Sequence, residues 1–217
     1  CSGTNTIDFD KDYDYLEWTQ RGVLRYKGTP FTGILEHSKG DWLQSEERYD
    51  EGLQNGISVY YREDGTLREE TEYKEGVLNG FSKKYFEDGR LKTIEEYKDR
   101  KLTVLLKHYE NGQKELEGEY INDSTILTTY YREDGTLREI QTRVNGVLEG
   151  KQMEYYETGE LYMEYFLKDG EINGTYKSYW ENGQVGQIIE FKNAVDGPTK
   201  IFYENGKEKR KQMGISD

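Results

Sequence analysis

The sequence predicts an all-β fold, an elongated single-layer antiparallel β-meander of about eight repeated hairpins. Three observations carry this prediction. A glycine recurs about every 24 residues, the residue before it is usually Asp or Asn, and aromatic residues keep the same period. A fixed period of this length indicates a repeat protein in which each unit is one supersecondary element. The recurring glycines are Gly40, Gly65, Gly89, Gly112, Gly135, Gly159, Gly183 and Gly206.

Each unit is predicted to begin with a second glycine, such as Gly56 or Gly150, that kinks a strand. The Asp-Gly or Asn-Gly pair that follows predicts a tight hairpin turn, because both residue types tolerate a positive φ. A second strand then leads into a looser turn at pairs such as Glu75-Gly76. Leu67 and Tyr73 lie two and eight residues after a turn glycine, so their shared parity predicts that they face the same side of the sheet.

The chain is predicted to have three parts. Residues 1–21 form an N-terminal tether or cap, residues 22–210 form the hairpin array, and residues 211–217 form a polar C-terminal tail. No helix is predicted anywhere along the chain.

The composition limits both the core and the partners. Hydrophobic residues make up 33% of the chain and charged residues 34%, which is poor material for a thick two-layer core. The 20 tyrosines suit a thin sheet, because the ring packs while the hydroxyl meets water. The net charge of −13 disfavours nucleic acid and anionic lipid as partners. No apolar run approaches the ~20 residues that span a bilayer.

Cys1 is the single cysteine, so the chain cannot form an internal disulfide. The start Cys-Ser-Gly-Thr-Asn resembles a mature bacterial lipoprotein, in which the cysteine thiol carries a diacylglycerol. That resemblance implies a lipid attachment at Cys1 and a place in the bacterial envelope, with the outer membrane favoured. A cloning boundary and a cytoplasmic location are the alternative, and intact-mass analysis of the native protein distinguishes the two.

Two columns of side chains beside the turn glycine form the predicted interaction face. Four residues before the glycine stand Tyr61, Tyr85, His108, Tyr131, Tyr155, Tyr179 and Phe202. Two residues before it stand Glu63, Glu87, Glu110, Glu133, Glu157, Glu181 and Glu204. The rings predict a stacked ladder that is either structural alone or also a binding surface. The glutamates either pair with Lys and Arg on neighbouring strands or bind a basic partner or Ca²⁺.

The repeated unit resembles the variant of the MORN repeat (MORN type 2) that occurs in bacterial proteins. The segments from Gly56 to Gly76 and from Gly150 to Gly170 carry the resemblance, and Pro30 to Gly33 resembles the segment that opens such arrays. Proteins with these repeats are often described as YwqK-family antitoxins. The resemblance covers about residues 22–210 and implies an elongated single-layer sheet used in protein interaction.

The predicted function is a non-catalytic repeat scaffold that presents an acidic, Tyr-rich face to an unidentified protein, anchored as an envelope lipoprotein. An antitoxin-like regulator that sequesters a protein toxin is the alternative, and a carbohydrate-binding protein or hydrolase is less favoured. The two histidines, His37 and His108, stand apart, and no His/Cys cluster has zinc spacing. We therefore predict no catalytic residue, no metal and no cofactor. Membrane contact is predicted only through Cys1, and the oligomeric state stays open.

Overall fold

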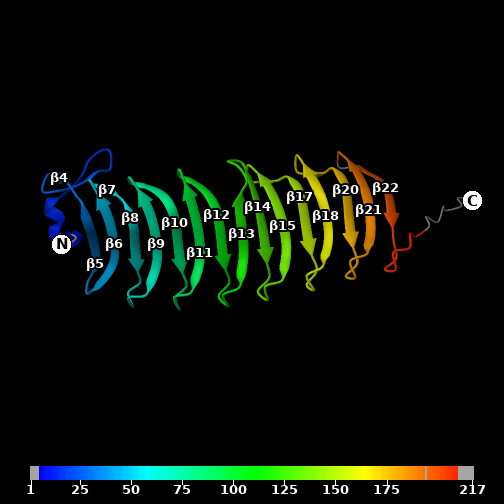
Figure 1. Ribbon diagram of the computed structural model, residues 1–217, viewed down its shortest axis with the longest axis horizontal. Helices are drawn as coiled ribbons and strands as arrows, with labels where there is room; N and C mark the ends of the chain where they lie inside the picture. Colours follow the sequence, from blue (N-terminus) through cyan, green and yellow to red (C-terminus); the bar gives the residue numbers. More distant parts are fainter. Residues whose placement is uncertain (1–4, 194, 210–217) are drawn as a thin grey trace, which may run out of the picture. The chain divides into compact units, whose positions relative to one another are not determined.

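The computed structural model describes residues 5–193 and 195–209, and the chain divides into two compact units, Cys1–Gly112 and Gln113–Asp217. Both units consist almost entirely of β-strands joined as consecutive antiparallel hairpins (Figure 1). This arrangement confirms the predicted all-β repeat meander.

In the first unit, each main strand pairs antiparallel with the next one in the chain, from β5 to β12. The strands are β5 (Gly33–Lys39), β6 (Trp42–Asp50), β7 (Leu53–Gln54), β8 (Gly56–Tyr61), β9 (Leu67–Lys74), β10 (Val77–Tyr85), β11 (Leu91–Lys98) and β12 (Lys101–His108). The short strand β7 also pairs with β6, and Asn55 separates it from β8. The backbone kinks there because Gly56 has φ +95°.

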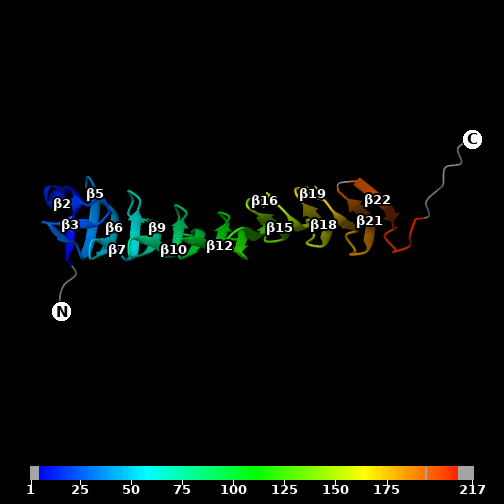
Figure 2. The same ribbon diagram turned by 90° about the horizontal axis from the view of Figure 1, so that it is seen from above.

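The segment before β5 folds onto the first hairpin. Strand β1 (Thr6–Asp8) pairs in parallel with β5. A separate small sheet, beside β5 in Figure 2, consists of β2 (Leu16–Trp18), β3 (Leu24–Tyr26) and β4 (Thr29–Pro30). The buried residues Ile7, Leu24, Phe31 and Leu35 form the core cluster between these elements. Large apolar side chains are therefore concentrated at this end of the first unit.

The prediction that the chain has no helix is wrong for one turn. Helix α1 (Phe9–Asp12) follows β1, and a 3₁₀ turn, η1 (Tyr13–Tyr15), follows α1. The carboxylate of Asp8 caps α1, since it accepts hydrogen bonds from the backbone amides of Asp10 and Lys11. A four-residue helix has no apolar periodicity, so the cap is its only sequence signal.

The second unit repeats the same plan, and its main strands also pair antiparallel in chain order. The strands are β13 (Lys114–Tyr120), β14 (Thr125–Tyr131), β15 (Leu137–Val144), β16 (Val147–Leu148), β17 (Gly150–Tyr155), β18 (Leu161–Lys168), β19 (Glu171–Ile172), β20 (Gly174–Tyr179), β21 (Val185–Lys192) and β22 (Val195–Ile201). Breaks before Gly150 and Gly174, both with positive φ, correspond to the break at Gly56.

The predicted turn types are reversed in the structure. The segment expected to be looser is a two-residue type I′ turn: Glu75 has φ +50° and Gly76 +77°, and Lys74 pairs with Val77. The Asp-Gly segment expected to be tight is instead a longer loop. There, the amide of Arg62 donates to the carbonyl of Thr66 (2.8 Å), and only Gly65 has a positive φ.

The Asp or Asn before the turn glycine therefore acts through its side chain rather than its backbone. Asp64 accepts hydrogen bonds from the backbone amide of Thr66 (2.9 Å) and from its hydroxyl (2.6 Å). Asn182 likewise accepts from the amide of Gln184 (2.9 Å). These contacts close the loop by the mechanism that favours Asp and Asn in turns.

A β-bulge in the hairpin of β8 and β9 makes the prediction from residue parity wrong. In the pairing of β8 with β9, the register shifts between Tyr60, which faces Glu69, and Tyr61, which faces Leu67. The extra residue, Arg68, breaks the alternation of side chains. Leu67 and Tyr73 consequently do not share a face as predicted.

The most buried side chains along the middle of the first unit are small and polar. Ser58 faces Thr71, Thr71 faces Ser82, and all three are at most 5% exposed. Tyr60 and Tyr73 lie on the same face by strand alternation and cover these hydroxyl groups. Burial and the nearby Glu47 raise the pKa of both tyrosines. The sheet thus shields its centre with tyrosine rings rather than with a second layer.

Two turn glycines with the same φ differ in how closely other atoms approach them. Gly52 and Gly146 both have φ +81°, but a Cβ at Gly52 would lie 2.5 Å from the carbonyl oxygen of Leu24, whereas one at Gly146 would meet nothing within 4 Å. We expect Gly146→Ala to lower the free energy of unfolding by about 1 kcal/mol, the backbone cost alone. Gly52→Ala should cost about 2 to 4 kcal/mol, because overpacking adds to that cost.

Urea denaturation followed by circular dichroism measures both losses. Equal losses for the two variants would contradict the close approach of the β6–β7 turn to the N-terminal segment.

Candidate functional site

The glutamate column lies on the loops that connect the strands of each hairpin. Every member is exposed to solvent, in the first unit (Glu63, Glu87 and Glu110) and in the second (Glu133, Glu157, Glu181 and Glu204). In Figure 1 these loops line the lower edge of each unit. Each of these loops therefore presents an exposed glutamate at the loop edge of its unit, and some present a second exposed carboxylate, such as Asp64 beside Glu63.

The aromatic column lies at the strand ends beside these loops and is half-buried throughout. Two of its hydroxyl groups bind glutamates of the preceding strand pair, whereas that of Tyr155 contacts the sulfur of Met153 (4.0 Å). Tyr85 donates to Glu70 (2.5 Å), and Tyr179 donates to Glu164 (2.8 Å). Burial first, and then the paired carboxylate, raise the pKa of each of these tyrosines to about 12. These contacts make Tyr85 and Tyr179 part of the sheet's own packing.

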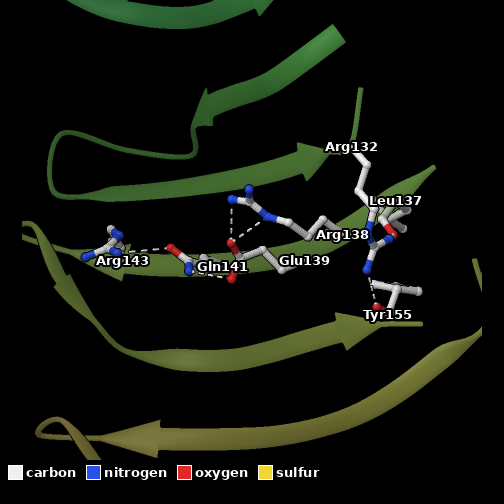
Figure 3. Close-up of polar contacts among 7 residues, drawn as sticks. All are labelled: Arg132, Leu137, Arg138, Glu139, Gln141, Arg143 and Tyr155. Carbon is white, nitrogen blue, oxygen red and sulfur yellow. Dashed lines mark hydrogen bonds and ion pairs between the residues drawn. The ribbon is translucent and has the colours of Figure 1, made fainter. Parts of the chain in front are cut away.

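The sequence analysis missed a third column, three residues before the turn glycine. Arg62 donates to the carbonyl of Leu67 in its own hairpin (2.6 Å) and to the carbonyl of Tyr85 in the next hairpin (2.5 Å). Arg132 repeats this in the second unit, with Leu137 (2.6 Å) and Tyr155 (2.7 Å) as acceptors (Figure 3). One guanidinium therefore joins the loop of one hairpin to the strand end of the next.

Aromatic donors take the same role further along the second unit. The hydroxyl of Tyr156 donates to the carbonyl of Tyr179 (2.7 Å), and the indole nitrogen of Trp180 donates to the carbonyl of Phe202 (3.3 Å). We call these four residues the loop donors: Arg62, Arg132, Tyr156 and Trp180. The four residues share only an N–H or O–H donor, and the same position before Gly89 holds Phe86, which has no side-chain donor, so the sequence gives no common signal.

A chain of polar contacts runs along β15 next to a loop donor. Glu139 accepts hydrogen bonds from Arg138 (2.8 Å) and Gln141 (2.9 Å), and Arg143 donates to Gln141 (3.0 Å) (Figure 3). Glu154 faces Glu139 directly on β17. Burial and the Glu139 carboxylate raise the pKa of Glu154.

Glu164, on β18, has the opposite surroundings. Its carboxylate lies 2.7 Å from the ammonium of Lys151 and 3.7 Å from that of Lys177, and it accepts the hydroxyl of Tyr179. The hydrogen bond from Lys151 is the main cause of a lowered pKa at Glu164. Neighbouring strands thus hold one destabilised and one stabilised carboxylate.

Within residues 5–193 and 195–209, no group of three or more His, Cys, Asp or Glu side chains is arranged to hold a metal ion. In the same residues, no helix is long and apolar enough to cross a membrane. Cys1, the predicted lipid-attachment residue, lies outside the described residues.

The loop donor Arg132 has a matched control in Arg138. We expect Arg132→Ala to lower the free energy of unfolding by about 2 kcal/mol, because several carbonyl groups lose a charged hydrogen-bond donor. Arg138→Ala removes an ion pair with Glu139 and a contact with the ring of Tyr130, both made by a half-exposed guanidinium, and should cost less than about 1 kcal/mol. Urea denaturation of the two variants checks this, and equal losses would refute the role of the loop donor.

Glu154 and Glu164 should respond oppositely to the same substitution. At pH 7, Glu164→Gln should lower the free energy of unfolding and Glu154→Gln should raise it, each by about 0.5 kcal/mol. The lowered pKa of Glu164 means that its contribution is complete above the usual glutamate pKa of 4.5 and is lost as the pH falls through the lowered value. The raised pKa of Glu154 means that its charged carboxylate destabilises the folded state at pH 7. This destabilisation is lost as the pH falls from the raised pKa to the usual value of 4.5.

Denaturation midpoints measured from pH 7 to pH 3 test both signs. Both differences from the unmodified protein should shrink toward pH 3, with that of Glu154→Gln vanishing at the higher pH. Destabilisation by both substitutions at pH 7 would contradict the assignment.

Parts of the chain are similar to a known protein family. The MORN repeat variant model matches residues 54–75, 148–169 and 172–193. Each matched segment covers a kinked strand, a glutamate-bearing loop and the strand that follows, in both units. None of the curated proteins matches the chain. These three segments are therefore similar to the variant MORN repeat.

Proposed function

We propose that this chain is a non-catalytic scaffold whose loop glutamates bind a basic surface of a partner protein. One observation carries the proposal: the exposed glutamate stands next to the loop donor that ties its loop to the next hairpin. Glu63 follows Arg62, and Glu157 and Glu181 follow Tyr156 and Trp180. The carboxylates are therefore held in position before a partner arrives, which lowers the entropic cost of binding.

The charge of the chain supports a basic partner. The net charge is −13, and complementary potentials increase association rates and discriminate against wrong partners. The tyrosine column contributes less to such a surface, because Tyr85 and Tyr179 are half-buried and their hydroxyl groups already bind glutamates.

The finer predictions from the sequence remain part of the proposal. A protein toxin with a basic surface is one partner that these loops would suit, as the antitoxin-like alternative requires. A lipid anchor at Cys1 would hold the scaffold at the bacterial envelope, preferably at the outer membrane. Neither prediction alters the surface through which the partner binds.

Charge reversal on the loops tests the proposal. The variant Glu157→Lys, Glu181→Lys and Glu204→Lys removes the loop carboxylates from three consecutive hairpins. We expect it to capture at least about tenfold less partner than the unmodified chain in affinity purification from the native cell, because like charges then face each other.

The matched control reverses Glu119, Glu171 and Asp196, which are exposed and lie away from these loops. It changes the net charge equally and should retain the partner. Equal loss in both variants would show that only net charge matters, and capture of no protein by the unmodified chain would refute the scaffold.

A further inference from the structure

In several hairpins, the residue three positions after the turn glycine lies beside the residue three positions before it. The ammonium of Lys92 is 5.4 Å from the ring centre of Phe86, and that of Lys209 is 4.7 Å from the ring centre of Tyr203. In another hairpin, the ring of Tyr162 packs 4.8 Å from that of Tyr156. We call the two positions the loop pair.

Where the first member of the loop pair is Arg, the second member still places a cation on an aromatic ring. The guanidinium of Arg68 lies 5.8 Å from the ring centre of Tyr60, and that of Arg138 lies 5.1 Å from the ring centre of Tyr130. The second position of the loop pair is therefore where this chain repeatedly puts its own Lys or Arg against a ring.

Two hairpins of the second unit have no cation at this position: one has Tyr162 there, and the other has no side chain at all. In the latter hairpin, the loop pair is Trp180 and Gly186, and a Cβ at Gly186 would lie 3.3 Å from the indole nitrogen of Trp180. Beside them lies a hollow of about 240 Å³, which we call the ring hollow. Its lining includes Tyr156, Tyr162, Ser178, Trp180, Gln187 and Lys209.

The surroundings of the ring hollow favour a positive group. Tyr162 is 40% exposed, so its ring can be reached from solvent. Burial and then nearby negative groups, including Glu181 and Glu204, raise the pKa of Tyr156. Lys209 also lines the hollow, but its ammonium already lies on the ring of Tyr203.

We propose that the ring hollow binds a lysine or arginine side chain of the partner's basic segment. A cation positioned over Trp or Tyr is attracted by the negative face of the ring, most strongly for Trp. The incoming side chain would take the place that Lys92 and Lys209 occupy in their own hairpins. This inference rests on the proposed scaffold function and names the group that the partner contributes.

A peptide titration tests the proposal directly. The probe is acetyl-Gly-Ser-Lys-Ser-Gly-amide, and the reference peptide has Gln in place of Lys. Nuclear magnetic resonance of the indole N–H groups reports binding, with the Trp180 signal assigned by its loss in Trp180→Phe. We expect the lysine peptide to shift this signal saturably and to bind about tenfold more tightly than the glutamine peptide.

Gly186→Lys supplies the missing cation from the chain itself and should weaken binding of the lysine peptide about tenfold. Should this variant fail to fold, Tyr162→Ser removes one exposed ring of the hollow and should weaken binding severalfold. Tyr13→Ser, at an exposed tyrosine of the first unit, is the matched control and should leave binding unchanged.

Equal binding of the two peptides would overturn the proposal, and so would a Trp180 shift caused by a neutral sugar such as maltotriose but not by the lysine peptide. Partner capture separates this inference from the scaffold function. If the loop-glutamate variant loses the partner while Gly186→Lys binds it unchanged, the ring hollow is refuted and the scaffold function stands.

Discussion

The repeat structure depends on the hydrogen bond from each loop donor to the strand end of the next hairpin. A meander already joins its strands through backbone hydrogen bonds, and the loop donors add a bond to a strand-end carbonyl of the next hairpin. Arg132 donates to the carbonyl of Tyr155, and Trp180 donates to that of Phe202. A buried or half-buried carbonyl without a partner is costly, so these contacts hold consecutive hairpins in a defined register.

That constraint explains how a chain with 33% hydrophobic residues maintains ordered hairpins. Large apolar side chains gather around Leu24 and Leu35 near the N-terminal segment. Elsewhere in the first unit, the sheet buries small hydroxyls such as Ser58 under tyrosine rings. Many of the polar side chains beside the tyrosines have a nearby partner, as Tyr49 has in Glu47 (3.0 Å), although the hydroxyl of Ser58 has none.

The period and composition sufficed for the all-β class, the repeated hairpin and the exposure of Glu63 and its equivalents. The period and composition did not predict the turn types. Asp64 closes its loop by a side-chain hydrogen bond, while Glu75 takes the positive φ that Asp or Asn more often adopts. The loop donors were missed for a similar reason. Arg132, Tyr156 and Trp180 differ in size and charge, and only the acceptor carbonyls, 22 to 24 residues later in the chain, reveal a common role.

The loop pair shows how a repeat can acquire a binding site without a new element of structure. In four hairpins a Lys or Arg at the second position already lies against an aromatic ring, as Lys92 does against Phe86. Replacing that residue by glycine leaves the ring and its surroundings unchanged but removes the internal cation. At Gly186 the neighbouring hairpin also contributes Tyr156 and Tyr162, so the vacant position lies among three rings. Specificity then follows from which repeat lacks its own cation, while the framework that positions the rings stays the same.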